Sequence, residues 1–322
     1  MKELQIAVIG AGLGGLTCAR ELRDAGAGVV VFEKSRSLGG RLATRRWEGQ
    51  VVDHGAPWFT DVPERLRELC QDNLRCLTLP VLDWRSGTAL PEPSGGRWYL
   101  AAGTNRLGNR LAEGLEVRLE SQIDALELQP DGRWQVAGAC FDAVVLTAPW
   151  PQSRRLLAPW LDEPAGQTQP NYRRALTALF EYAGDPSEAA MAWSGMEHAS
   201  PSSGLERSLC ENHKIGRVPP GRTVIVAHGT PRFSGENFDM DREAWAALLE
   251  MEVRKAWGLA QAPRAGFTHR WGFSTIDRPF EKMPQLPDRV YLAGDAVSGT
   301  GVGAVYRSGL TAARALLTGV SA

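Results

Sequence analysis

Short runs of apolar, often β-branched residues occur at both ends of the chain, at residues 5–9 (QIAVI), 29–32 (VVVF), 141–149 (FDAVVLTAP) and 291–293 (YLA). Continuous apolar runs of this length are typical of parallel strands that are buried on both faces. Between the first two runs, Leu16, Ala19 and Leu22 recur at helical spacing, so we expect a helix that ends near Ala25. The N-terminus is therefore predicted to be a strand–helix–strand unit.

The middle of the chain has a different pattern. Strands are predicted at residues 175–182 and 222–230, and a hairpin turn at Asp131-Gly132. A helix is predicted from about 241 to 257, capped by Asp239 or Asp241 and ended by Gly258. Its buried face should hold the apolar side chains Trp245, Leu248, Leu249 and Ala256. A last helix is predicted over residues 303–317, so the chain is expected to be an α/β protein.

The first predicted strand runs directly into a GxGxxG motif. Gly10 permits a tight turn, Gly12 allows backbone N–H groups to approach a pyrophosphate, and Gly15 lets the helix pack close to the strand. Glu33 ends the next strand, where its carboxylate can accept hydrogen bonds from ribose hydroxyls. The strand before the motif, the helix after it and the acid together predict a dinucleotide site.

Composition narrows the classes of function. The 322 residues suffice for roughly two domains, and the net charge of −1 gives no general attraction for nucleic acid or an acidic membrane. No apolar run approaches the length of a membrane span, and the N-terminal run is short for a signal peptide, so we expect a cytoplasmic protein. The five cysteines and five histidines have no metal-ligand spacing, and we expect no metal.

Three further motifs carry a resemblance. Gly39-Gly40-Arg41 follows the second strand, residues 51–59 read VVDHGAPWF after a hairpin-like stretch, and Gly294-Asp295 ends the last strand. With these motifs the chain resembles the flavin amine oxidase superfamily. The resemblance implies FAD, held non-covalently because no cysteine lies near residues 301–306. It also implies a strand at residues 119–127 whose Ile123 backbone borders the adenine. The implied cofactor residues are Gly10, Gly12, Leu13, Gly14, Gly15, Glu33, Lys34, Gly40, Arg41, Gly55, Ala56, Pro57, Ile123, Gly294, Asp295 and Val302.

The resemblance also implies an architecture. A Rossmann-like FAD-binding domain would be assembled from residues 1–59, 101–151 and 281–322. An inserted α+β substrate domain would be built from residues 60–100 and 152–280. The C-terminal segment would then complete the site that the N-terminal segment opens, and the last helix would point its N-terminus at the flavin, where negative charge develops on reduction.

A closer resemblance lies in the middle of the chain. Residues 213–217 (HKIGR), 224–239 (VIVAHGTPRFSGENFD) and 268–274 (THRWGFS) resemble renalase and its bacterial relatives. This resemblance implies oxidation of the 2- and 6-dihydro isomers of NAD(P)H to NAD(P)⁺, with hydride passing to flavin N5 and O₂ reduced to H₂O₂. His228, Trp271 and Trp58 are the first candidates for the reaction site. Further pocket candidates are Phe59, Tyr172, Arg173, Arg174 and Arg270.

Two alternatives stay open from the sequence. One is an amine oxidase or a related dehydrogenase of the same superfamily. The other is a flavin-binding accessory protein without turnover. A dihydronicotinamide is already a strong hydride donor, so positioning against the flavin would carry most of the catalysis. This agrees with a chain in which no catalytic dyad is evident.

Overall fold

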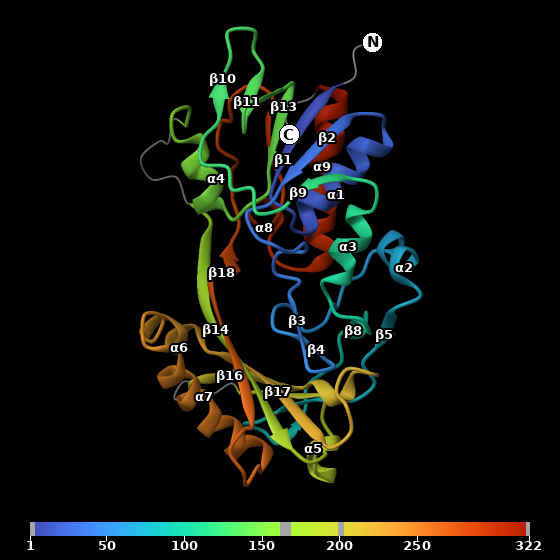
Figure 1. The fold of residues 1–322 in the computed structure, drawn as a ribbon, viewed down its shortest axis with the longest axis vertical. Coiled ribbons are helices and arrows are strands. Elements are labelled where there is room, and N and C mark those ends of the chain that lie inside the picture. The colour runs from blue at the N-terminus through green and yellow to red at the C-terminus, as the bar shows by residue number, and fades with distance from the viewer. Residues whose placement is uncertain (1–3, 162–168, 199–202, 320–322) are drawn as a thin grey trace.

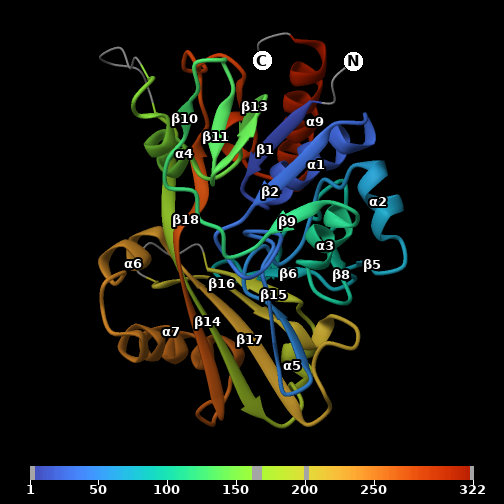
Figure 2. The same ribbon diagram turned by 45° about the horizontal axis from the view of Figure 1, so that its top comes forward.

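The computed structural model describes residues 4–161, 169–198 and 203–319. Two sheets dominate it (Figure 1): a parallel sheet flanked by helices in the upper part and a larger, mostly antiparallel sheet in the lower part. Both ends of the described chain lie in the upper part, as the turned view also shows (Figure 2). The expected α/β class with a Rossmann-like part is confirmed.

The upper sheet has the strand order β19-β13-β1-β2-β9, and all four pairings are parallel. The N-terminal strand–helix–strand prediction is confirmed by β1, α1 and β2, and the FDAVVL run by β13, which pairs with β1. The elements are β1 (Gln5–Ile9), α1 (Leu13–Asp24), β2 (Gly28–Phe32), β9 (Glu116–Arg118), β13 (Ala143–Leu146) and β19 (Val290–Leu292).

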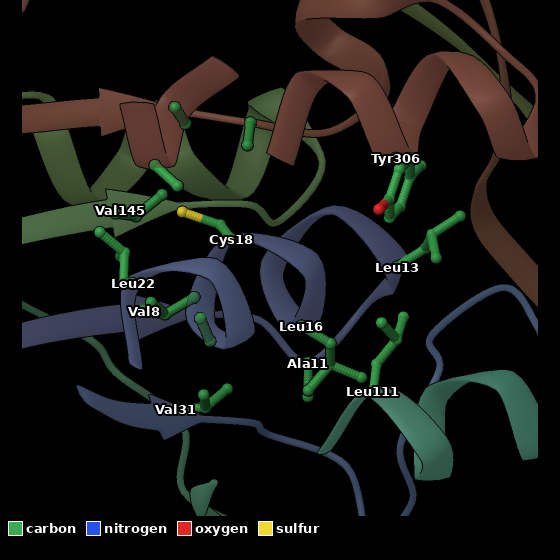
Figure 3. Packing of buried hydrophobic residues seen from close by; sticks show 14 of the residues in the cluster. Val8, Ala11, Leu13, Leu16, Cys18, Leu22, Val31, Leu111, Val145 and Tyr306 are labelled. Carbon is green, nitrogen blue, oxygen red and sulfur yellow. The ribbon is translucent and has the colours of Figure 1, made fainter. Parts of the chain in front are cut away.

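Strand β1 is buried on both faces, as its unbroken apolar run predicted. Ile6 and Val8 face α1 and α9 (Val302–Thr318), whereas Ala7 and Ile9 face the opposite cluster. Figure 3 shows the first of these cores, with the Tyr306 ring of α9 beside Leu13 at the start of α1 and with Leu16 close to Ala11 and Leu111. The C-terminal helix thus packs directly on the N-terminal unit.

The opposite face of the parallel sheet is covered by a three-stranded antiparallel sheet and α4. The predicted turn at Asp131-Gly132 lies between the first two of these three strands, so this prediction is confirmed. The elements are β10 (Glu127–Leu128), β11 (Trp134–Val136), β12 (Ala139–Phe141) and α4 (Trp150–Leu157).

The lower sheet has the order β18-β14-β17-β16-β15-β6-β7, with only the β15–β6 pairing parallel. Its two longest strands, β14 and β18, pair along most of their length and reach up to the parallel sheet (Figure 1). The strands are β6 (Val81–Asp83), β7 (Thr88–Ala89), β14 (Asn171–Ala183), β15 (Gly195–Glu197), β16 (Leu205–Cys210), β17 (Arg222–Gly229) and β18 (Ala265–Arg278).

One face of the lower sheet is covered by α7 (Arg242–Trp257). Asp241 caps this helix by accepting from the backbone N–H groups of residues 243 and 244, and Gly258 ends it with a left-handed conformation, as predicted. Trp245 and Leu249 are fully buried, but Leu248 is 41% exposed. The prediction that Leu248 lies on the buried face was wrong, because it lies beyond the edge of the stripe that faces the sheet.

The remaining elements lie outside these sheets. The hairpin of β3 (Thr44–Trp47) and β4 (Gln50–Asp53) descends toward the lower sheet (Figure 1). The others are α2 (Glu64–Cys70), β5 (Leu74–Cys76), β8 (Trp98–Leu100), α3 (Arg106–Ala112), α5 (Glu188–Met191), η1 (Glu211–His213), α6 (Pro231–Glu236) and α8 (Asp295–Ser298). The division into two domains at the expected boundaries stays a prediction. No helix in the described part of the chain combines the length and apolar character needed to cross a bilayer.

Candidate functional site

The glycines of the first turn, which follows β1, are required for two different reasons. At Gly10 the φ of +109° itself favours glycine, and a Cβ on Gly15 would lie 2.1 Å from the Gly10 carbonyl oxygen. Gly12 is different, because its φ of −77° is ordinary and a Cβ there would meet no protein atom within 4 Å. Neither backbone strain nor packing within the protein requires glycine at position 12, and the open space there leaves room for a ligand to approach the backbone.

Glu33 follows β2 and is 8% exposed. Its Oε2 accepts from the Ala11 N–H at 2.8 Å, and its Oε1 accepts from the Ser35 N–H and hydroxyl at 2.8 and 2.6 Å. The carboxylate is thus held against the glycine turn, as expected of a ribose-binding acid. Lys34 extends to the side-chain oxygen of Gln152, 3.1 Å away.

The Gly39-Gly40-Arg41 segment lies directly beside the first turn. The Gly39 N–H donates to the Ala11 carbonyl at 2.9 Å, and Gly40 adopts a φ of +56°. The 55–57 segment packs on it in turn, since a Cβ on Gly55 would lie 2.0 Å from the Arg41 carbonyl oxygen. The next N–H, that of residue 56, donates to this same oxygen at 2.9 Å. The motifs that carried the superfamily resemblance therefore contact one another.

The C-terminal glycine turn meets the N-terminal one. A Cβ on Gly14 would lie 3.1 Å from the Gly294 nitrogen. Asp295, 4% exposed, pairs with Arg41 at 2.5 Å and accepts from the Tyr172 hydroxyl at 3.1 Å. Burial, together with Asp295, raises the pKa of Tyr172, so this hydroxyl keeps its proton and donates. Tyr172 lies on β14, so a strand of the lower sheet reaches this junction.

Helix α9 begins just after this junction, with Val302 as its first residue. The carboxylate of Asp61 lies against the first turn, since a Cβ on Gly303 would come 2.0 Å from its Oδ2. Unpaired backbone N–H groups at a helix N-terminus favour negative charge. The Asp61 carboxylate also pairs with Arg307, at 3.2 Å, so a side chain from the segment just before α2 is held at the start of this helix.

These features fit an extended dinucleotide. The space at Gly12, the buried Glu33 carboxylate and the contact between both glycine turns suit the adenosine and pyrophosphate parts of FAD. The expected strand around Ile123 is wrong: β9 ends at Arg118 and β10 begins at Glu127. Ile123 packs instead as a partly buried side chain in the segment between them, because this part of the chain is not paired with a sheet.

The expected pocket residues Trp271 and His228 are joined through Thr177, on one face of the lower sheet. The Trp271 Nε1–H donates to the Thr177 hydroxyl at 3.2 Å, and that hydroxyl lies 3.3 Å from His228 Nδ1. In the register, Thr177 of β14 pairs with His228 of β17 on one side and His269 of β18 on the other. These residues face the β3–β4 hairpin rather than α7, because side chains alternate along a strand.

Two histidines of this group were not predicted. The His54 ring lies 5.1 Å from the His269 ring and stacks at 5.7 Å on Trp271. We call His54, Thr177, His228, His269 and Trp271 the His–Trp cluster. Burial, with a contribution from His269, lowers the pKa of His54 to about 4, and burial lowers that of His228 to about 3. Both imidazoles are therefore neutral at pH 7, and His54 Nδ1 and His228 Nε2 are buried without a partner among the described residues.

These neutral histidines predict a loss of stability in mild acid. The unfolded chain takes up protons on His54 and His228 below pH 6.5, whereas the folded chain does so only near pH 4 and 3. We expect the free energy of unfolding to fall by more than about 1 kcal/mol from pH 7 to 5. Urea denaturation at these pH values measures it, and His228→Asn should flatten the dependence. A flat profile in the wild type would contradict neutral burial. Asp53, whose pKa is about 2, titrates below this window.

Three other residues expected near the substrate, Trp58, Phe59 and Arg173, lie in different surroundings. Two guanidinium groups lie over the Trp58 ring, those of Arg207 at 5.4 Å and Arg97 at 5.6 Å from its centre. Phe59 is 2% exposed and belongs to the core beneath α2 and α3, which does not favour contact of its ring with a flavin. Arg173 is partly exposed and pairs with Asp277.

Strand register places Arg270 on the face of the lower sheet that carries α7. Arg270 pairs with Leu176, whose side chain lies in the core under α7, and its guanidinium donates to the carbonyl of Met240 just before that helix. The side chains of His269 and Trp271 point to the opposite face. Arg174 likewise lies over the Phe238 ring, 4.7 Å from its centre, on the α7 side. Neither arginine faces the His–Trp cluster.

Comparison with known proteins gives the family. The profile described as "NAD(P)-binding Rossmann-like domain" matches residues 8–72, and that described as "Flavin containing amine oxidoreductase" matches residues 83–317, more than two thirds of the chain. Among solved structures, a candidate protoporphyrinogen oxidase from Exiguobacterium sp. 255-15 superimposes with a TM-score of 0.79 at 17% identity, over 99% of this chain and all of that one. Cyclohexylamine oxidase from Brevibacterium oxydans gives 0.73 at 14% identity, covering 99% of each chain. These likenesses show the fold.

The matches to curated relatives cover only part of this chain and part of each relative. The probable flavin-containing monoamine oxidase A of Dictyostelium discoideum is 32% identical over 129 residues, 39% of this chain. The chain spans only 27% of that relative's length. The long profile match confirms the expected superfamily and, with it, the flavin cofactor FAD and the oxidoreductase class. This chain belongs to the family of flavin-containing amine oxidoreductases.

Proposed function

We propose that the protein is an oxidase with non-covalent FAD that converts the 2- and 6-dihydro isomers of NAD(P)H to NAD(P)⁺. When bound, the flavin supplies a two-electron acceptor that takes a hydride from the donor and passes the electrons to O₂, giving H₂O₂. The protein's own part is to hold the donor ring in position, since effective positioning accounts for a large share of such a barrier.

The observation that carries this proposal is the charge of the His–Trp cluster and its surroundings. His54 and His228 are neutral, and Trp271 adds an indole face. The nearby carboxylates of Asp53 and Glu197 are already paired, with Lys214 and Arg217 and with Arg207 respectively. Neither is left to hold an ammonium group, so the cluster suits an uncharged, planar donor ring better than a cationic amine.

The arginines around the cluster fit the rest of such a donor. The Arg45 guanidinium lies 4.5 Å from the Phe267 ring centre, and Arg207 lies over Trp58. Guanidinium groups suit phosphates, which they can bind through two parallel hydrogen bonds. An amine remains the second candidate donor, and the family match is the observation that favours it.

Anaerobic reduction distinguishes these donors. The purified yellow protein is mixed without oxygen with borohydride-made isomers of NADH, and the visible absorption of the flavin is followed. Rapid bleaching by the isomers, with release of H₂O₂ when O₂ returns, is the expected result. Bleaching by amines alone would support the second candidate. If no donor bleaches the flavin, the protein is an accessory flavoprotein and the proposal fails.

A further inference from the structure

Four charged side chains are buried together where the end of β4 meets the segment that follows β16. Asp53 ends β4, and Glu211, Lys214 and Arg217 come from the segment that joins β16 to β17. Asp53, Glu211 and Arg217 are completely buried, and Lys214 is 4% exposed. We call them the charge quartet. Two of its members, Lys214 and Arg217, belong to the HKIGR stretch, for which the proposed reaction gives no role.

The quartet is balanced in charge and closely connected. Lys214 Nζ lies 3.1 Å from Asp53 Oδ2 and 2.6 Å from Glu211 Oε1. Arg217 Nη1 lies 2.8 Å from Asp53 Oδ2 and 2.9 Å from Glu211 Oε2. Each cation thus contacts both carboxylates. A buried charge is tolerated when it is paired in this way, whereas removing one partner leaves another uncompensated.

Further hydrogen bonds fix the position of Asp53. Its Oδ1 accepts from the Thr44 hydroxyl at 2.7 Å and from the Thr104 N–H at 2.9 Å. Although burial alone would raise it, Lys214 and Arg217 lower the pKa of Asp53 to about 2. The Val51 N–H donates to the Arg217 carbonyl at 2.9 Å. The end of β4 is therefore fastened to the lower sheet through both side chains and backbone.

The residues that follow Asp53 are those of the candidate site. His54 is next, with its ring against His269 and Trp271, and then Gly55, which packs on the Arg41 backbone. Asp53 and His54 are consecutive residues, so a displacement of the Asp53 backbone would also displace His54. The quartet lies beside the site without belonging to the His–Trp cluster.

We propose that the charge quartet is a positioning device, in which Lys214 and Arg217 hold Asp53 so that His54 lies against Trp271 and segment 54–57 keeps its place beside the cofactor. Charge balance in the quartet is what fixes this geometry. The proposal rests on the proposed function only where the rate of flavin reduction by a donor is measured. The NMR signal of His54 and the absorption spectrum of the flavin are measured without a donor.

The test compares Lys214→Met with the charge-balanced double variant Glu211→Gln/Lys214→Met. The single change leaves one excess negative charge, whereas the double change keeps the Asp53–Arg217 pair. Histidine-labelled holoenzyme is observed by NMR, with the flavin absorption spectrum recorded beside it. We expect Lys214→Met to shift the His54 signal and to slow flavin reduction at saturating donor by about tenfold or more, since small misplacements are costly. The double variant should return both readouts to near wild type.

Arg133→Met, which removes an exposed ion pair with Asp131, is the matched control and should change neither readout. An unchanged His54 signal in a folded Lys214→Met variant overturns the proposal. The proposal is also overturned if the double variant changes the His54 signal and the rate of flavin reduction as much as the single variant does. Restoring charge balance would then not compensate for the loss of the Lys214 side chain. If Lys214→Met does not fold, the double variant is compared with the wild type alone. A shifted His54 signal in the double variant then overturns the proposal. Should the wild type show its His54 signal but no donor oxidation, the proposed function fails while the positioning result stands.

Discussion

Replacing Gly12 with alanine is expected to weaken FAD binding by about tenfold or more, while the flavin-free protein keeps its stability. The new methyl group would enter open space at the first turn and meet no protein atom within 4 Å. The φ of −77° accepts alanine without strain. Crowding a close contact costs about 1–3 kcal/mol, so the cost should fall on the bound cofactor alone. Titration of flavin into the deflavinated protein measures the affinity, and urea denaturation measures the stability.

Gly15→Ala is the matched control for this result. A methyl group at Gly15 would lie 2.1 Å from the Gly10 carbonyl oxygen and 2.6 Å from the Thr147 hydroxyl. The contact is with the protein itself, so both stability and flavin affinity should fall. If Gly12→Ala binds FAD as the wild type does, the pyrophosphate does not pass at this turn. If Gly12→Ala destabilises the flavin-free protein as much as Gly15→Ala does, then the methyl group at position 12 contacts protein atoms and the space there is not open.

Arg217→Met is expected to lower the free energy of unfolding by about 3–5 kcal/mol. The substitution leaves the buried carboxylates of Asp53 and Glu211 with Lys214 as their shared cation, and it removes the donor to the Leu100 carbonyl, now 2.5 Å away. Loss of one partner from a buried charge set is costly because the remaining charge cannot reach water. Urea denaturation of the holoenzyme and of the flavin-free protein measures the change.

Arg217→Lys retains the charge and should therefore lose less stability than Arg217→Met. It should still be less stable than the wild type, because a lysine cannot reproduce the two-sided contact of the guanidinium. Arg133→Met removes an exposed pair and should stay within about 0.5 kcal/mol of the wild type. A loss of this small size in Arg217→Met would mean that the quartet is not buried as described. It would also remove the basis for its positioning role.

The sequence was sufficient where the signal was local. The first glycine turn, its helix and the following acid lie within about thirty residues, and their order alone indicated the Rossmann-like unit. The caps of α7 were predictable for the same reason, since Asp241 and Gly258 act within one turn of the helix. The return of the C-terminal turn to Gly14 came from the superfamily resemblance rather than from any pattern in the residues.

The sequence could not predict features that depend on strand register or on contacts between residues far apart in the chain. Whether Arg270 or its neighbours face the pocket depends on the parity of β18 against β14, and a pattern of residues does not give that parity. His54 stood in a recognised motif, but its ring contacts come from a strand more than two hundred residues away. Lys214 and Asp53 are separated by 161 positions, so no local signal joins them.

The alternation along β14, β17 and β18 has a consequence for divergence. Thr177, His228 and His269 belong to the His–Trp cluster on one face of the lower sheet, while Leu176, Ala178 and Ala227 in the same strands fill the core under α7. A substitution at these three positions of the cluster can therefore change the surface of the cluster without touching the core under α7. Leu179 and Val226 lie on the same face but are buried in a core of their own, so they do not share this freedom. If the proposed function holds, a change of donor selectivity should be sought first at Thr177, His228 and His269 rather than in the surrounding loops.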